Sequence, residues 1–484
     1  MKDLPAFFIL TFCVCFMSFV PRTNHAQPSI VWDSVIEVST QDFGNKCSRI
    51  VLNSSGNPMV LHGKSGNNAG LYLSIWDGLS FGAPIQVTEE TNIYLSESEG
   101  PRIAVSGNRV AVSYQISGQW DTGAYVVISE DSGLTWGIPY PLAPLATEDH
   151  FMPNIAFDGN SQPWAALKWR TTPTYEGVHL FNSDTDSFEP ALNAGIATAG
   201  QPVCECCPSN PFFYDGIFYD VVRNNNSNIR DFWLLKSPDG VNWGEAIDID
   251  PADWYISSCP ASGASSAILS DGTLVSAFMN APDGSRVYWS SVDLSTFTLI
   301  ESARIDPLNN STENHPSLSA SGDWLVAAWE RNSSGYDVMV SVSDIGPSAL
   351  SNSIFNVTEE LSGHNRNPSV VYDGEFIHLV YKNTASGTTH YLKGVISGTS
   401  NIERLDEGNE VWTLSSTPSE WLITSSISEH TSFTLFDLNG RMLDSGEFYE
   451  NMSISKGFNG RNKEISRILH VNNGTKSMSF KLIK

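Results

Sequence analysis

The stretch Ser129-Glu130-Asp131-Ser132-Gly133-Leu134-Thr135-Trp136 follows the β-rich run at residues 125–128 and has the pattern S-x-D-x-G-x-T-W. The short polar side chains of Ser129 and Asp131 can bond to the backbone of a tight turn, and Gly133 supplies a position with positive φ. Trp136 then covers the turn with a large apolar ring. The pattern therefore predicts a tight turn that follows a strand.

This pattern resembles the Asp-box of sialidases and other BNR-repeat proteins, which lies between the third and fourth strands of a β-propeller blade. A second copy keeps Ser237, Asp239, Gly240 and Trp243 but is one residue short. The resemblance implies a propeller of the sialidase-like type. It implies no activity, because the Asp-box holds a blade together and performs no chemistry.

A glycine-centred hairpin turn recurs about every 50 to 57 residues, which suits four-stranded blades. Several copies are Asp-Gly pairs flanked by alternating apolar residues, a strong hairpin signal. The turns are centred on Gly56, Gly107, Gly159, Gly216, Gly272, Gly322 and Gly374. We therefore predict an all-β fold with a seven-bladed propeller. The alternative is six blades, the number in catalytic sialidases.

Residues 30–38 have the pattern of a fourth strand without the three strands that would precede it. We expect this segment to complete the last blade and so close the ring. Closure would remove a free sheet edge, which is otherwise a site of unwanted pairing.

The chain carries a formal net charge of −26 and has a pI near 4.6. This charge argues against binding nucleic acid or an anionic membrane and is typical of a well-solvated surface. Residues 1–26 combine Lys2, an apolar stretch and a cleavage site after Ala26, which predicts an export signal. No other segment is apolar and long enough to span a membrane. We expect a secreted or cell-surface protein that is a monomer.

The pattern changes after about residue 405, so we assign residues 27–405 to the propeller and 410–484 to a small β-sandwich. The core F-x-L-x-D-x-x-G-R at residues 433–441 and the terminal K-L-I-K resemble the C-terminal sorting domain of the type IX secretion system. That resemblance implies transport to the outer-membrane surface of a Bacteroidetes-type bacterium, with the type IX machinery as a partner. The alternative is an ordinary β-sandwich.

Binding sites of sialidase-like propellers lie on the face opposite the Asp-boxes, so candidate residues are sought in the loops of that face. Basic residues end the second strand of several blades, and arginines can bind a carboxylate bidentately. These residues are Lys64, Arg170, Arg223, Arg331 and Lys382. Two readings stay open. The three arginines converge on an acidic ligand, or each pairs with a neighbouring carboxylate.

Pro101-Arg102-Ile103-Ala104 resembles the Arg-Ile-Pro motif whose arginine holds the carboxylate of sialic acid in sialidases. Asp121 follows at the place of that family's acid/base aspartate, a pair of roles that fits glycoside cleavage. Arg49 in Ser48-Arg49-Ile50 is an equally good candidate for the arginine. The proline of the motif is missing, and the nucleophilic tyrosine with its glutamate partner cannot be chosen from the sequence.

Five cysteines follow the predicted signal, all in loops that lead into blades on the open face. Cys204, Cys206 and Cys207 precede one blade and Cys259 precedes the next, while Cys47 stands apart. An oxidising exterior favours a disulfide between the two loops. The alternative is a copper(I) or zinc site, with His150, His315 and His364 from other loops as additional candidate ligands.

Three functions remain open at this point. The first is an exported propeller that binds a glycan or another extracellular ligand. The second is a sialidase-like glycoside hydrolase that uses Arg102 and Asp121. The third is a metal-binding propeller centred on the cysteines, the only place where the sequence suggests a cofactor.

Overall fold

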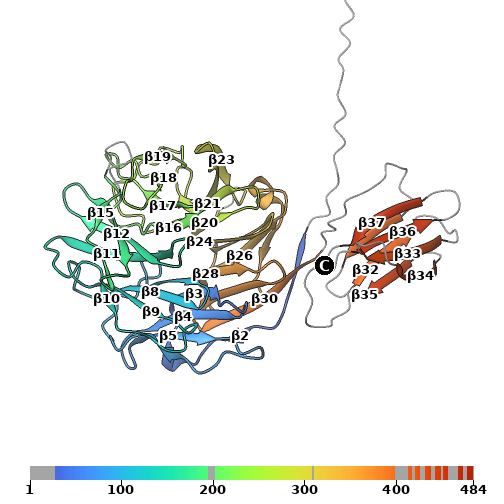
Figure 1. Cartoon of the computed structure of the whole chain (residues 1–484), viewed down its shortest axis with the longest axis horizontal. Helices are drawn as coiled ribbons and strands as arrows, with labels where there is room; N and C mark the ends of the chain where they lie inside the picture. Colours follow the sequence, from blue (N-terminus) through green and yellow to red (C-terminus); the bar gives the residue numbers. More distant parts are fainter. Residues whose placement is uncertain are drawn as a thin grey trace, which may run out of the picture.

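The computed structural model describes residues 28–194, 202–307 and 310–397, together with strands of the tail between residues 412 and 482. Within these residues the chain is almost entirely β, and seven antiparallel sheets follow one another in a ring (Figure 1). The seven-bladed propeller predicted from the glycine turns is confirmed, and the six-bladed alternative is wrong.

Each blade is a meander whose first strand lies nearest the centre of the ring. From the first blade to the last, the strands are β3–β6 (Lys46–Leu52, Pro58–Lys64, Gly70–Ile75, Ile85–Gln86), β7–β10 (Arg102–Ser106, Arg109–Gln115, Ala124–Ser129, Tyr140–Pro141), β11–β15 (Asp149–Phe157, Pro163–Arg170, Tyr175–Asn182, Ser187–Phe188, Leu192–Asn193), β16–β19 (Asn210–Tyr214, Ile217–Arg223, Phe232–Ser237, Glu245–Asp248), β20–β23 (Ser265–Ile268, Thr273–Asn280, Arg286–Asp293, Thr298–Arg304), β24–β27 (Thr312–Ser321, Trp324–Asn332, Tyr336–Ser343, Ile354–Asn356) and β28–β30 (Asn365–Tyr372, Ile377–Asn383, Thr389–Ser397). In the described part of the chain, the short 3₁₀ helices η1 (Gln41–Phe43) and η3 (Pro347–Asn352) lie between strands.

The N-terminal segment closes the ring as expected. Strands β1 (Ser29–Trp32) and β2 (Ile36–Glu37) both pair antiparallel with β30, so the last blade combines the two ends of the propeller. Trp32 lies over Gly394, where a Cβ atom would meet the indole ring at 2.7 Å. Glycine at this position therefore lets the closing strand pack tightly against the blade.

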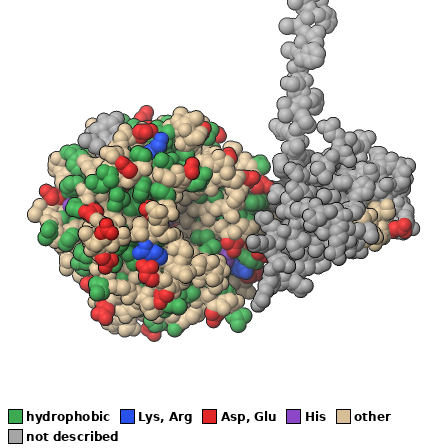
Figure 2. Space-filling model, in the orientation of Figure 1, with side chains coloured by type: hydrophobic (Ala, Val, Ile, Leu, Met, Phe, Trp, Pro, Cys, Tyr) green, Lys and Arg blue, Asp and Glu red, His purple; other side chains and the backbone are tan. Residues whose placement is uncertain are grey.

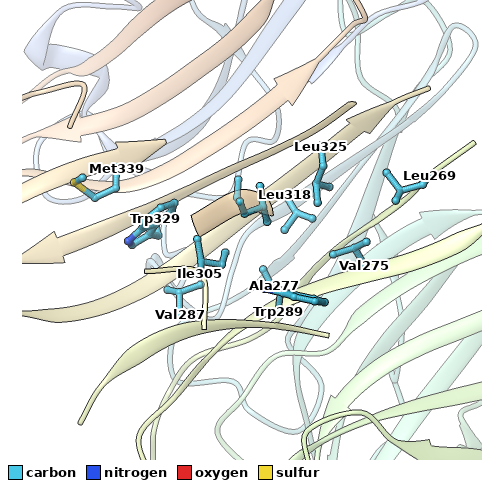
Figure 3. Close-up of a cluster of buried hydrophobic side chains, with 12 residues drawn as sticks. Leu269, Val275, Ala277, Val287, Trp289, Ile305, Leu318, Leu325, Trp329 and Met339 are labelled. Atoms are coloured by element: carbon cyan, nitrogen blue, oxygen red, sulfur yellow. The ribbon is translucent and has the colours of Figure 1, made fainter. Parts of the chain in front are cut away.

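The hydrophobic core lies between neighbouring blades. The cluster in Figure 3 joins the fifth and sixth blades, with Trp289 and Val287 on β22 facing Trp329 and Leu325 on β25. Similar clusters occur between other pairs of blades. Large apolar rings fill the space between sheets because twisted blades diverge toward the rim, and burying such rings stabilises the ring of blades.

The Asp-box forms the turn that its sequence predicts. The Asp131 carboxylate accepts hydrogen bonds from Ser129 Oγ at 2.8 Å and from Thr135 N at 2.8 Å. Gly133 has φ 87° and lies against Leu73 of the preceding blade. The second box is similar: Asp239 accepts from Ser237 Oγ, and the Trp243 indole donates to Gly240 O at 2.8 Å. Each box thus closes its own turn and also contacts the preceding blade, the second through Gly240 against Leu180 and Trp243 against Trp164.

The described strands of the tail form two antiparallel sheets, in agreement with a small β-sandwich. One sheet contains β31 (Trp412–Ser416), β32 (Glu420–Ser425) and β35 (Asn451–Ser455), and the other contains β33 (Thr431–Asp437), β34 (Met442–Phe448), β36 (Arg467–Asn472) and β37 (Ser477–Leu482). The predicted export signal at residues 1–26 and the Gly-Arg part of the sorting motif at 438–441 lie outside the described residues.

None of the helices in the described part of the chain is long and apolar enough to cross a membrane. On the face of the propeller in Figure 2, acidic side chains are scattered rather than gathered, and basic side chains are few. No cluster of exposed positive charge is visible on this face.

Candidate functional site

A cavity of about 390 Å³ lies on the axis of the ring. Its walls come from the first strands of all seven blades and from the loop before β7. The lining includes Arg49, Glu97, Ser98, Arg102, Asn154, Asn210, Ser262, His315 and Asn367. Most of these residues lie at the beginnings of the innermost strands, which places them toward the face opposite the Asp-boxes.

A recurring β-bulge sets the backbone around this cavity. The pairing register shifts at the same place in four innermost strands, and one residue there has positive φ: Cys47, Met152, His315 and Asn367. A bulge locally re-aims side chains. Here it adjoins the point at which polar residues line the cavity.

Serine hydroxyls connect the innermost strands of neighbouring blades. Ile50 N donates to Ser369 Oγ at 3.2 Å, Val370 N donates to Ser317 Oγ at 3.0 Å, and Leu318 N donates to Ser265 Oγ at 2.9 Å. These bonds satisfy buried backbone groups that have no strand partner on that side. They also fix the cavity wall, so the site is built on rigid elements.

Two arginines in the cavity have no acidic partner among the described residues. Arg49 donates to Ser48 O at 2.8 Å and to Glu97 O at 2.5 Å, and Arg102 donates to Ser98 O. All three acceptors are neutral carbonyl groups. Burial, and then the positive charge of Arg49, lower the pKa of Arg102 to about 9, and burial lowers the pKa of Arg49. Arg102 therefore remains cationic at neutral pH, and an anion between the two guanidinium groups would offset the unfavourable effect of Arg49 on Arg102.

The carboxylates near this arginine pair already have partners. Glu97 accepts from Lys382 Nζ at 2.9 Å and from Cys47 N at 2.9 Å. Glu330 binds Arg366 through two hydrogen bonds of 3.2 and 3.0 Å. Because these acids are engaged elsewhere, the charge of Arg49 and Arg102 is left available to a ligand.

Neutral polar groups complete the cavity wall. His315 Nε2 lies 3.8 Å from Glu330 Oε1, yet burial dominates and lowers the pKa of His315, so the imidazole is neutral at pH 7. Asn367 is 4% exposed, and its Nδ2 has no hydrogen-bond partner among the described residues. A buried amide without a partner costs free energy. A ligand oxygen in the cavity would satisfy it.

A tyrosine and a glutamate meet in the loop before β7. Tyr94 donates to Glu99 Oε2 at 2.5 Å. Burial and this hydrogen bond raise the pKa of Tyr94 to about 12, which makes its phenol a poor nucleophile as it stands. Neither residue lines the cavity. The sequence did not single out this pair, because the tyrosine lies in an irregular loop.

The second-strand arginines do not converge. Arg170 pairs with Asp149, and Arg331 pairs with Asp306. Arg223 is fully buried, donates to Arg230 O and Met279 O, and lies over the Phe232 ring. Of the two readings, the geometry gives each arginine its own partners, because the second strand of a blade is one strand farther from the axis than the cavity wall.

Unlike the second-strand arginines, the two candidate arginines of the sialidase-like motif lie in one site. Arg49 and Arg102, proposed as alternatives, both line the same cavity. Asp121 is exposed, and its carboxylate accepts from Thr122 N and Oγ1. It does not line the cavity, so the structure does not bring Arg102 and Asp121 together in one site.

The cysteines of the two neighbouring loops gather as expected. Cys206 and Cys259 form a disulfide, while Cys204 and Cys207 are buried thiols. The sulfurs of Cys204, Cys206 and Cys207 lie within 4.8 Å of one another, close enough to share one metal ion. Cys206 would have to be reduced first, because a metal ligand is a thiolate.

The candidate histidine ligands do not join these cysteines. His150 Nδ1 donates to Glu148 O and its ring stacks on Trp169, His315 lies in the central cavity, and His364 contacts Tyr336. Among the described residues the only His/Cys/Asp/Glu group with metal-binding spacing is the cysteine cluster.

Comparison with known proteins gives no assignment by sequence. No family model matches the chain, and no curated protein matches it. Solved structures that resemble it include a protein of unknown function from Dyadobacter fermentans, at 10% identity, 76% coverage of this chain, 98% of that chain and a TM-score of 0.46. The polysaccharide lyase Uly1 is 11% identical, with coverage of 75% and 99% and a TM-score of 0.48. The Trypanosoma rangeli sialidase in complex with the inhibitor DANA is 10% identical, with coverage of 94% and 89% and a TM-score of 0.42. Likeness at this level assigns no activity to this chain.

Proposed function

We propose that this protein is a glycan-binding propeller that takes a carboxylate-bearing saccharide into the mouth of its central cavity. The observation that carries the proposal is the pair Arg49 and Arg102, two partly buried guanidinium groups that donate to carbonyl oxygens and lack an acidic partner among the described residues. Guanidinium groups bind carboxylates with charge-assisted bonds.

The rest of the cavity suits a sugar. Its volume of about 390 Å³ is within the range of small-ligand sites, about 300–1,000 Å³. Asn367 and Asn210 each present an amide atom with no partner in the described chain, and both line the cavity. Sugar hydroxyl groups can donate to and accept from such amides.

Binding is favoured over cleavage. Glycoside hydrolysis ordinarily needs two carboxyl groups on either side of the scissile bond. In the described cavity wall, Glu97 is the only acid, and Lys382 and Cys47 N already bind it. Asp121 lies outside the cavity, and the raised pKa of Tyr94 disfavours a tyrosine nucleophile.

Calorimetric titration with a small panel of saccharides tests this proposal. We expect acidic sugars such as sialyllactose or galacturonate oligomers to bind and neutral lactose not to bind. Arg102→Gln should weaken acidic-sugar binding by about 10- to 100-fold, whereas Arg170→Gln should leave it unchanged because Arg170 pairs with Asp149 on the rim. Equal affinities for acidic and neutral sugars would refute the proposal. Release of a fluorogenic aglycone from a sialoside would show that the site is catalytic.

We further propose that the chain is exported and that its tail directs transport by the type IX system. The predicted signal at 1–26 and the sorting-like motif support this proposal. Mass spectrometry of the protein from the host's culture medium and outer membrane should find a first residue near 27 and a last residue before about 410. An intact tail on surface protein would contradict the sorting role.

A further inference from the structure

Four cysteines from two neighbouring loops form a chain of adjacent sulfur atoms that the proposed glycan site does not use. We propose that these cysteines constitute a thiol–disulfide relay, in which the buried dithiol Cys204/Cys207 exchanges with the Cys206–Cys259 disulfide at the surface. This inference is independent of ligand binding in the central cavity.

The sulfur positions carry the proposal. Cys204 Sγ lies 3.4 Å from Cys206 Sγ, a sulfur of the disulfide, and 3.4 Å from Cys207 Sγ. Cys204 and Cys207 are fully buried, whereas Cys259 is exposed. One buried sulfur therefore contacts both the second buried thiol and the disulfide, and the far end of the disulfide faces solvent.

The surroundings of Cys204 favour its thiolate, which is the nucleophile in exchange. Arg230 Nη1 lies 2.9 Å from Cys204 Sγ, and its position is supported by Glu205 at 3.5 Å. The hydrogen bond from Cys207 and the charge of Arg230 lower the pKa of Cys204 to about 6 despite burial. Burial raises the pKa of Cys207, which stays a thiol with its Sγ 3.4 Å from Cys204 Sγ.

Exchange within the chain requires two displacement steps. The Cys204 thiolate attacks Cys206 Sγ, which forms a Cys204–Cys206 bond and releases Cys259 as a thiolate. Cys207 then loses its proton and attacks Cys204 Sγ, which forms a Cys204–Cys207 disulfide and releases Cys206. The buried pair has lost two electrons and the surface pair has gained them, so no external oxidant is needed.

The reduced surface pair can then act on a small-molecule disulfide. Cys259 attacks that disulfide and releases one thiol, and Cys206 displaces the second thiol as the Cys206–Cys259 bond re-forms. The net reaction oxidises Cys204 and Cys207 to a disulfide and reduces the external disulfide to two thiols. A C-x-x-C spacing, which Cys204 and Cys207 have, is common in redox-active pairs.

Disulfide mapping of the full chain with oxidised glutathione tests the relay. In wild-type protein we expect two released thiols per chain and a Cys204–Cys207 bond in peptide mass spectra. Cys207→Ser should stop after the first step, with a Cys204–Cys206 bond and glutathione attached to Cys259. Cys204→Ser should slow thiol release by at least about 10-fold. Cys47→Ser serves as the control, because Cys47 lies on β3 in another blade.

Circular dichroism shows whether each variant is folded, and the mapped disulfide bonds then decide whether the relay operates. The relay is refuted if folded wild-type protein keeps only the Cys206–Cys259 bond at every glutathione ratio. It is also refuted if the purified chain holds one equivalent of zinc or copper on thiolates of this cluster with no disulfide present. Trapping of the Cys204–Cys206 bond in Cys207→Ser would support it.

Discussion

Arg49 and Arg102 keep their charge available because the acceptors of their hydrogen bonds are backbone carbonyls of β3 and of the loop before β7. Arg170 and Arg331, on second strands, reach Asp149 and Asp306 instead and are neutralised there. Arginines on the second strands therefore stabilise the fold through ion pairs, whereas the arginines near the axis are the ones proposed to bind a ligand. Position within the blade decides between these roles.

Buried acids give the clearest prediction of pH dependence at the residue scale. Asp231 is 2% exposed, and burial together with Asp250 raises its pKa to about 7. Between about pH 4 and pH 7 the folded chain then holds a proton that the unfolded chain has released. Stability should fall as pH rises through this window. Asp231→Asn, which keeps the acceptor for Trp254 N, should reduce the fall.

Urea unfolding of wild type and Asp231→Asn at about pH 4.5 and about pH 7.5 measures this difference. Between the lower and the higher pH, we expect the urea midpoint of the wild type to drop by more than that of the variant. Equal drops in the two proteins would show that Asp231 does not bind the extra proton.

At the scale of the element, the Asp-box depends on a glycine that serves two purposes. Gly133 has φ 87°, and a Cβ there would overlap Leu73 of the preceding blade. Gly56 has φ 79° in another turn, but a Cβ there would meet nothing within 4 Å. A comparison of alanine substitutions at the two positions therefore distinguishes the cost of backbone strain from the cost of steric overlap between blades.

We therefore expect Gly133→Ala to lower the free energy of unfolding by about 1–3 kcal/mol more than Gly56→Ala. Denaturant melts of both variants, with wild type alongside, provide the comparison. Equal losses of unfolding free energy would mean that only the positive φ is costly and that the Asp-box is not in close contact with the preceding blade.

At the scale of the whole molecule, residues 29–37 close the ring of the propeller. Strands β1 and β2 pair with β30, and Trp32 lies over Gly394. Gly394→Val would push the closing strand away, which exposes a sheet edge and should promote association between chains. Gly244→Val is the matched control, because a Cβ at Gly244 would meet nothing within 4 Å.

Thermal unfolding and size-exclusion chromatography test the closure. We expect Gly394→Val to lower the melting midpoint by several degrees, about 2–4 °C per kcal/mol, and to form larger species on heating. The Gly244→Val protein should behave as wild type. If Gly394→Val also behaves as wild type, the N-terminal strands do not secure the ring.

Features of the chain differ in how far the sequence could predict them. Blade number and closure were predictable because glycine turns and alternating strands are local signals repeated along the chain. The meeting of Arg49 and Arg102 was not, since it depends on the path of an irregular loop and on the geometry of the ring. The cysteines could be grouped from their loops, but which of Cys204, Cys206 and Cys207 bonds to Cys259 required the structure.

The most direct test of the central claim is the affinity of the protein for sialyllactose compared with its carboxylate methyl ester. The ester keeps the sugar and removes the charge that Arg49 and Arg102 are proposed to bind. We predict that wild type prefers the acid by at least about 10-fold and that the Arg49→Gln/Arg102→Gln variant loses this preference. Should the two ligands bind wild type equally, or should the double variant keep the preference, the arginine pair is not the anion site.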